Sequence, residues 1–333
     1  MADANEIMAP EILPQGEPRR NWRDIYFTGY DGIRLYARHY PGDKSKRPIV
    51  CLSNITQNGR SYEPLANAIS SHKFGNRPVY TIDYRGRGLS ENDPNWKNYT
   101  PFIEMADLMN FLSLERIHQP TFIGSGWGGV ILMTLATMHS SMLGPVILND
   151  TGPKFETNGI IRVHAFIGRL PLPTSWLKAA EQLRDLYGNS FTDLTNEDWR
   201  RIAYQNFNQK DVKPAPAYDP ELQKALMMLD VTKGPPIMWE QFLALSHVPV
   251  LAIRGENSDV LSKATFEEMF NRHPNLQMFT VANEGHCPLL DDDLTIERIR
   301  LFLEKCDQPA HYEDEEAGYE NPAYSQHHSS LIS

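Results

Sequence analysis

The chain has 333 residues, enough for one large α/β domain with an insertion or for two small domains. Its 32 Lys and Arg against 42 Asp and Glu give a net charge of −10, which argues against charge-driven binding to nucleic acid or to an anionic membrane. No apolar run approaches the roughly 20 residues that span a bilayer, and three cysteines are too few for a disulfide framework. We therefore expect a soluble cytoplasmic protein with reduced thiols, no membrane insertion and no nucleic-acid partner.

Strand-like and helical stretches alternate along the chain after an irregular N-terminal arm over residues 1–22. Short buried strands separated by helices predict an α/β protein with a mostly parallel central sheet and helices on both faces. The expected strands are 34–40, 49–52, 79–83, 121–124, 145–149, 248–254 and 278–281, and the main expected helices are 64–70, 102–114, 130–139 and 294–305.

The pattern changes in the middle of the chain. Between residues 154 and 241, Trp, Leu and Met recur at helical spacing, interrupted by proline-rich turns at 170–173 and 213–216. Strand signals return afterwards, so this segment interrupts one sheet and does not begin a second domain. We predict a core of residues 23–153 and 242–305, a helical lid insertion over 154–241, and an acidic disordered tail over 306–333.

A glycine-rich turn joins the expected strand 121–124 to an apolar helix and reads Gly124-Ser125-Gly126-Trp127-Gly128-Gly129. Strand, tight turn and helix are the setting of the nucleophile elbow, G-x-S-x-G, whose nucleophile occupies a strained backbone position. Alignment of the outer glycines on Gly124 and Gly128 puts Gly126 at the nucleophile position. The other register makes Ser125 the nucleophile, but it places Ile123 where the first glycine belongs.

Together with three further segments, this turn resembles the α/β-hydrolase family over residues 23–305. Residues 81–90 resemble the D-x-R-G-x-G-x-S turn that follows the fourth strand of that family, 250–259 resemble the strand and loop of the triad acid, and 284–288 resemble the loop of the triad base. The resemblance implies an α/β-hydrolase fold with Asp259 as the acid and His286 as the base. It also implies esterase-like chemistry on small molecules.

Two oxyanion-hole donors are implied by the same resemblance. They are the backbone amide of Trp127, after the nucleophile position, and that of Ile55, in the loop after the third strand. In that loop the family usually has a glycine where this chain has Asn54. Asn tolerates positive φ better than most residues that carry a side chain, so we expect the turn to survive.

Simpler roles remain open for several of these residues. Asp259 could only cap a helix over 261–271, and His286 could be an ordinary loop histidine. Cys287 could substitute as the nucleophile, although neighbouring residues of an extended loop are expected to point in different directions.

The glycine at the nucleophile position leaves three interpretations of function. First, the chain is inactive or weakly active and serves as a ligand-binding or regulatory protein, because Gly126 cannot form an acyl-enzyme. Second, it is a hydrolase or lyase that uses the His286/Asp259 pair as a general base. Third, it is a working serine esterase inactivated at this position, in which case Gly126→Ser restores activity.

The expected partner is a small ester, lactone or hydrophobic ligand. No metal or cofactor is expected, because the sequence has no dinucleotide-binding glycine pattern, P-loop or cluster of metal ligands. In the tail, Asn321-Pro322-Ala323-Tyr324 resembles the N-P-x-Y peptides that adaptor domains bind as an added strand. This predicts weak adaptor binding through Asn321, Pro322 and Tyr324.

Overall fold

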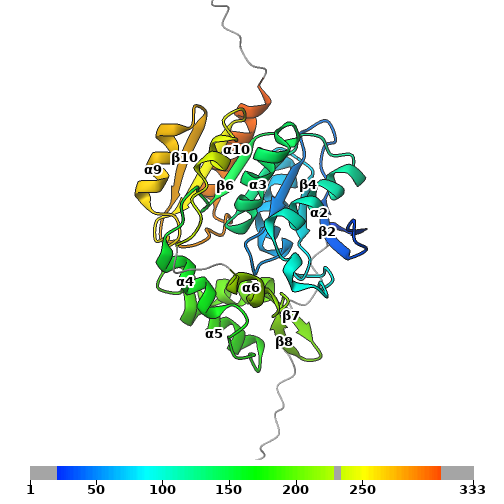
Figure 1. Cartoon of the computed structure of the whole chain (residues 1–333), viewed down its shortest axis with the longest axis vertical. Coiled ribbons are helices and arrows are strands. Elements are labelled where there is room, and N and C mark those ends of the chain that lie inside the picture. The colour runs from blue at the N-terminus through cyan, green and yellow to red at the C-terminus, as the bar shows by residue number, and fades with distance from the viewer. Residues whose placement is uncertain (1–20, 229–233, 309–333) are drawn as a thin grey trace, which may run out of the picture.

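The computed structural model describes residues 21–228 and 234–308. In this part of the chain, eight strands form one sheet in the order β1-β2-β4-β3-β5-β6-β9-β10 (Figure 1). The pairs β1–β2 and β2–β4 are antiparallel, and every pair from β4 to β10 is parallel. The strands are β1 (Arg23–Thr28), β2 (Arg34–Tyr40), β3 (Ile49–Leu52), β4 (Val79–Asp83), β5 (Thr121–Ser125), β6 (Val146–Asn149), β9 (Val250–Gly255) and β10 (Leu276–Val281).

The mostly parallel sheet expected from the sequence is confirmed, and the expected strands 34–40, 49–52 and 79–83 match β2, β3 and β4 to the residue. The edge strand β1 was not among the expected strands, because most of its side chains are exposed and the buried alternation is weak. Its pairing with β2 supplies the antiparallel edge of the sheet.

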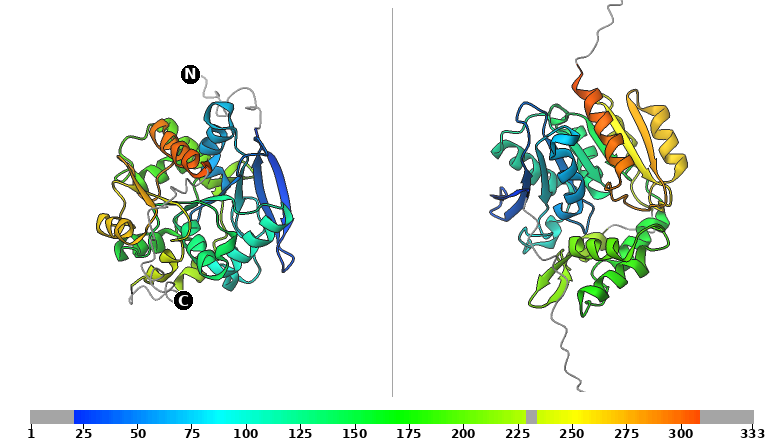
Figure 2. Two further views of the ribbon diagram at one scale, coloured as in Figure 1. Left: turned by 90° about the horizontal axis from the view of Figure 1, so that it is seen from above. Right: turned by 180° about the vertical axis from the view of Figure 1, so that it is seen from behind.

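Each central strand contributes to two hydrophobic cores, because successive side chains point to opposite faces of a sheet. In β3, Val50 and Leu52 belong to the core beneath α2, α3, α8 and α9, whereas Ile49 and Cys51 belong to the core beneath α1 and α10. Figure 2 shows these helices on the two faces. The sheet helices are α1 (Glu63–Ser70), α2 (Pro101–Leu114), α3 (Trp127–Met138), α8 (Trp239–Leu243), α9 (Lys263–Arg272) and α10 (Asp293–Asp307), with 3₁₀ turns η1 (Gly59–Tyr62), η2 (His72–Phe74), η3 (Trp96–Asn98) and η4 (Ser140–Met142).

The inserted segment lies at one end of the molecule (Figure 1) and has a small core of its own around Leu183, Phe191 and Trp199. The turn expected at 213–216 is wrong, because Lys213–Pro216 forms a strand. A two-stranded ladder has no inner strand, so its prolines need not donate to a second neighbour. The elements are α4 (Thr157–Phe166), α5 (Trp176–Tyr187), α6 (Asn196–Asn206), β7 (Phe207–Lys210), β8 (Lys213–Pro216) and α7 (Leu222–Met227).

The two ends of the chain fall largely outside the described residues. The N-P-x-Y motif at 321–324 and nearly all of the N-terminal arm belong to these parts. Helix α10 continues to Asp307, two residues past the expected end of the core. Among the helices that are described, none has the length and apolarity needed to cross a membrane.

Candidate active site

Gly126 alone forms the turn between β5, which ends at Ser125, and α3, which begins at Trp127. Its φ of 49° and ψ of −107° lie in a region that residues with side chains adopt only under strain. A Cβ atom added at this position would lie 2.7 Å from Cγ of Asn54. The space that a side chain at position 126 would need is therefore filled by Asn54.

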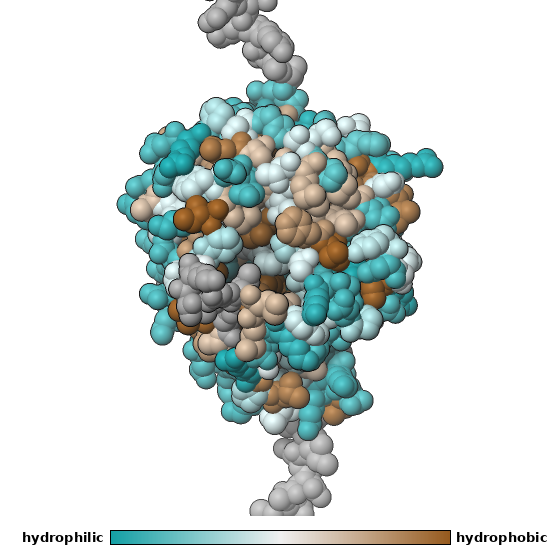
Figure 3. All heavy atoms as spheres, viewed as in Figure 1, coloured by the Kyte–Doolittle hydropathy of each residue, from teal (hydrophilic) through white to brown (hydrophobic). Residues whose placement is uncertain are grey.

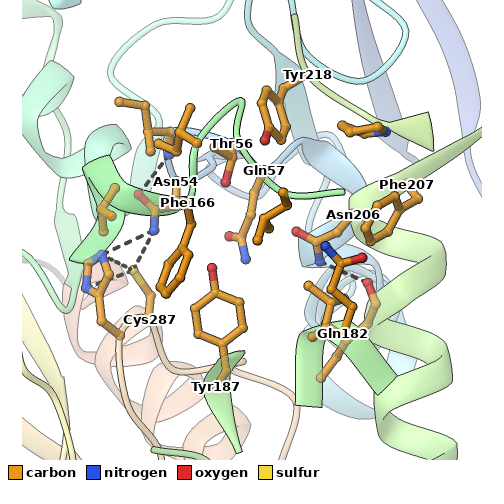
Figure 4. A pocket seen from close by; sticks show the side chains of 18 of the residues that line it. Asn54, Thr56, Gln57, Phe166, Gln182, Tyr187, Asn206, Phe207, Tyr218 and Cys287 are labelled. Carbon is orange, nitrogen blue, oxygen red and sulfur yellow. Dashed lines mark hydrogen bonds between the residues drawn. The ribbon is translucent and has the colours of Figure 1, made fainter. Parts of the chain in front are cut away.

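The carboxamide of Asn54 is held by hydrogen bonds at both of its polar atoms (Figure 4). Its Oδ1 accepts the backbone N–H of Ile55 at 2.8 Å and that of Trp127 at 3.2 Å. Its Nδ2 lies 3.2 Å from Nε2 of His286. The two amides expected to form an oxyanion hole thus converge on one oxygen atom, which belongs to the protein itself.

The turn at Asn54 still directs the amide of Ile55 toward that of Trp127, but it does so without a positive φ at Asn54. Asn54 is not among the residues with positive φ, so the loop does not use the conformational freedom of Asn. What distinguishes this position is the side chain, because a glycine there would leave both amides and the space opposite Gly126 open.

The ring of His286 is fixed between Asn54 and a carboxylate. Its Nδ1 lies 2.8 Å from Oδ2 of Asp150, and because an ionised carboxylate only accepts, Nδ1 donates. The Asn54 atom that accepts two backbone N–H groups must be the carboxamide oxygen, Oδ1. The other atom is therefore Nδ2, which donates to Nε2 of His286. This pattern selects the neutral tautomer of His286 with its lone pair on Nε2.

The carboxylate that binds His286 is Asp150 and not Asp259, the residue proposed from the sequence. Asp150 follows β6 directly and is fully buried. It also accepts the N–H of Gly255 at 2.9 Å and the hydroxyl of Ser258 at 2.5 Å. These bonds orient the carboxylate toward the histidine ring.

Asp259 instead binds Arg162 of α4 through two hydrogen bonds of 2.6 and 2.8 Å. Burial would raise the pKa of the Asp259 carboxyl, but the hydrogen bonds and charge of Arg162 outweigh it and hold the pKa below its ordinary value. Asp259 is not a helix cap either, since Ser262 caps α9. The ion pair accounts for its position, and no hydrogen bond joins it to His286 among the residues that the structure describes.

The sequence contained a signal for Asp150 that was not used. Asp150 comes immediately after the expected strand 145–149, and the carboxyl ends of parallel strands gather at one edge of a sheet. Strands β6 and β9 are neighbours, so the loops after both reach the same region. Which of the two carboxylates meets His286 depends on loop conformation, which sequence spacing does not reveal.

Ser125 and Cys287 were the other nucleophiles considered. The hydroxyl of Ser125 is buried, 2.7 Å from the hydroxyl of Tyr62 and 2.9 Å from Nδ2 of Asn149, within a hydrogen-bond network. The sulfur of Cys287 lies 3.4 Å from both ring nitrogens of His286, so it contacts the ring, contrary to the expectation that the two side chains point apart. Burial raises the pKa of the Cys287 thiol well above its ordinary value, which disfavours the nucleophilic thiolate.

A buried ion pair supports both amide donors. Arg87 and Glu104 are 2.6 Å apart, with side chains that are fully buried. Arg87 donates to the carbonyl of Ile55 at 3.0 Å, and Glu104 accepts the indole N–H of Trp127 at 2.5 Å. The residues that carry the two amides are therefore joined through one ion pair, which restrains their relative position.

Two cavities meet at this site and share Asn54, Ile55, Val163 and His286 in their walls. The first, of about 120 Å³, extends beneath α4, α5 and α6 (Figure 4). The second, of about 520 Å³, extends along α3 toward residues 234–241 and is mainly apolar. Figure 3 shows the surface hollowed between the sheet and the inserted segment, with apolar side chains beside the hollow.

No group of three or more His, Cys, Asp or Glu side chains within residues 21–228 and 234–308 is placed to hold a metal ion.

The comparisons with known proteins agree with this fold. The model of the alpha/beta hydrolase family matches residues 55–298. The chain is 28% identical over 278 residues to the 3-hydroxybutyrate-oligomer hydrolase of Cupriavidus necator, which covers 80% of this chain and 91% of that protein. It is 24% identical to esterase YbfF of Escherichia coli, over 81% of this chain and 98% of that one.

Among solved structures, an alpha/beta hydrolase from Novosphingobium aromaticivorans superposes with a TM-score of 0.78 and 31% identity, over 86% of this chain and 99% of that chain. The chain belongs to the alpha/beta hydrolase family.

Proposed function

We propose that this protein binds a small ester- or lactone-like ligand in the two cavities and does not form an acyl-enzyme with it. One observation carries the proposal: the carboxamide of Asn54 makes the contacts that a serine hydrolase offers to a reacting ester. Its oxygen accepts the backbone N–H groups of Ile55 and Trp127, and its nitrogen donates to Nε2 of His286. Gly126, opposite, supplies no hydroxyl.

The ligand class follows from the two cavities. The wall of the second cavity is mainly apolar, and the wall of the first combines apolar side chains with polar ones such as Gln57 and Gln182, a mixture typical of small-molecule sites. A ligand carbonyl can replace the Asn54 oxygen on the amides of Ile55 and Trp127 once the carboxamide turns away, and its two arms then enter one cavity each. The relatives named for hydroxybutyrate oligomers and esters support this class. On this proposal, residues 154–241 act as a lid, since α4, α5 and α6 wall the first cavity.

Titration calorimetry with δ-decalactone tests the proposal, with chromatography of the same samples to detect hydrolysis. We expect binding without turnover. In Asn54→Gly the internal competitor is removed, and we expect Kd to fall about tenfold, because the binding-competent fraction rises. Asn189→Gly, an exposed loop exchange outside both cavities, should leave Kd unchanged. Hydrolysis by the unmodified chain, or no binding at all, would overturn the proposal.

A second candidate function is general-base catalysis without a covalent intermediate. The observation that favours it is the tautomer of His286: Asp150 holds Nδ1, and the Nε2 lone pair becomes free to act as a base once the Asn54 carboxamide that it accepts from turns away. Such a base removes a proton next to a carbonyl and contributes about 10² to 10⁴ in rate. Proton–deuterium exchange at the α-carbon of δ-decalactone, followed by NMR, tests it: exchange that disappears in His286→Gln supports this function, and no exchange excludes it for this ligand.

A further inference from the structure

The first cavity has hydrogen-bonding groups on its wall that the proposed carbonyl site does not use. In Figure 4 the hydroxyl of Tyr187 and the amide of Gln57 point into the cavity from opposite sides. Burial raises the pKa of Tyr187 above its ordinary value, so its hydroxyl keeps its proton and can donate. This wall can therefore bind an oxygen atom carried on a ligand chain.

The wall of the first cavity carries almost no net charge. Arg162 is the only Lys or Arg lining the cavity in the part of the chain that the structure describes, and its guanidinium lies 5.7 Å from the centre of the Tyr187 ring. Asp259 neutralises this cation through a two-bond ion pair. His286, the other basic side chain on the wall, is bonded to the Asp150 carboxylate.

We infer that Asp259 sets the ligand charge that this cavity accepts, so that the site binds neutral oxygen-bearing chains, such as lactones and esters, and rejects free carboxylates. The inference deepens the proposed ligand-binding function and rests on it. A carboxylate entering the cavity loses its hydration and meets a cation that Asp259 already pairs. The Asp150 carboxylate behind His286 adds repulsion. A neutral ester or lactone has no charge to dehydrate and is not repelled by the Asp150 carboxylate, and its oxygens can accept hydrogen bonds from Tyr187 and Gln57.

The consequence is discrimination between an intact lactone and its own hydrolysis product. Ring opening by water turns a neutral ester bond into a hydroxyl and a carboxylate while the carbon skeleton stays the same. A site with this charge pattern keeps the first molecule and releases the second.

Calorimetric titration of δ-decalactone and of 5-hydroxydecanoate at pH 7.5 tests the inference. In the unmodified protein we expect the lactone to bind at least about tenfold more tightly than the acid. Asp259→Asn leaves Arg162 without its counter-charge, so the acid should gain about tenfold in affinity while the lactone changes little. The control Asp185→Asn makes the same charge change at an exposed position of α5 and should alter neither Kd.

A second variant covers the case in which Asp259→Asn does not fold. Arg162→Gln removes the cation and leaves Asp259 charged, so the Kd of the acid should rise relative to that of the lactone. If the ratio of the acid Kd to the lactone Kd stays unchanged in both variants, the inference is overturned while the proposed function stands. Failure of the unmodified protein to bind either compound would instead overturn the proposed function.

Discussion

Nδ2 of Asn54 lies 3.2 Å from Nε2 of His286, and the rest of the Asn54 carboxamide fills the space opposite Gly126. The two positions are complementary, because a glycine at 126 leaves the room that the Asn54 side chain occupies. The groups that would bind a reacting carbonyl in a serine hydrolase are therefore bonded to the chain itself. A serine placed at position 126 does not by itself create an open site.

Restoration of activity should require two exchanges. Gly126→Ser alone places its Cβ against the Asn54 carboxamide and should hydrolyse p-nitrophenyl butyrate no faster than the unmodified chain. Gly126→Ser combined with Asn54→Gly opens the space and both amides, and we expect a rate about 100-fold above either single variant, because nucleophile and oxyanion donors act as a unit. Equal rates for Gly126→Ser and the double variant would show that Asn54 does not block the site.

In that double variant, substitution of Asp150 should lower kcat far more than substitution of Asp259. Asp150→Asn removes the acceptor that holds the Nδ1 proton of His286, and kcat should fall on the order of 10³- to 10⁴-fold. Asp259→Asn leaves the His286 ring in place, and kcat for the neutral ester should change less than about twofold. Steady-state kinetics on the same ester gives the two kcat values. A larger loss of kcat in Asp259→Asn than in Asp150→Asn would identify Asp259 as the catalytic acid.

The sequence predicted the parallel sheet because its strands are short, buried on both faces and separated by helices, as in β3 and β4. It also predicted that Ile55, Trp127 and His286 come together, and the structure places their polar atoms around one carboxamide. It did not predict that Asn54 supplies this carboxamide, because side-chain direction in a loop is set by packing that periodicity does not report. The assignment of Asp259 as the partner of His286 failed for the same reason, since the carboxylate that reaches the ring is that of Asp150.

Glu284, in the loop that leads to His286, should make stability depend on pH. Burial raises the pKa of its carboxyl from 4.5 to about 7, although its bond to the Leu289 amide lowers it. The folded state therefore binds more protons than the unfolded state between these values, so the free energy of unfolding falls as pH rises from 4.5 to 7 and then levels off.

Glu284→Gln keeps an acceptor for the Leu289 amide without the charge. At pH 8 we expect it to be about 1–3 kcal/mol more stable than the unmodified chain, with the difference vanishing near pH 4.5. Urea unfolding at the two pH values measures this, with Glu267→Gln on the surface of α9 as the control. A variant less stable at pH 8 than the unmodified protein would contradict the assignment.

Cys306, the least buried of the three cysteines, should react first with a thiol reagent. Burial raises the pKa of Cys306 to about 11, that of Cys51 above this, and that of Cys287 well above its ordinary value. At pH 8 and without denaturant, Cys306 should be modified first, while Cys287 reacts only after unfolding. Peptide mass spectrometry after timed quenching gives the order, and early modification of Cys287 would make it an accessible nucleophile.

The intact mass of the unmodified protein after incubation with a fluorophosphonate tests the central claim most directly. A reactive serine hydrolase gains one phosphonyl group per chain, and the Gly126→Ser, Asn54→Gly double variant provides the positive control at position 126. With Asn54 filling the site and no hydroxyl at Gly126, we predict that the unmodified chain gains no adduct under conditions that label the double variant fully. A stoichiometric adduct on the unmodified chain, at Ser125 or any other serine, would contradict the account.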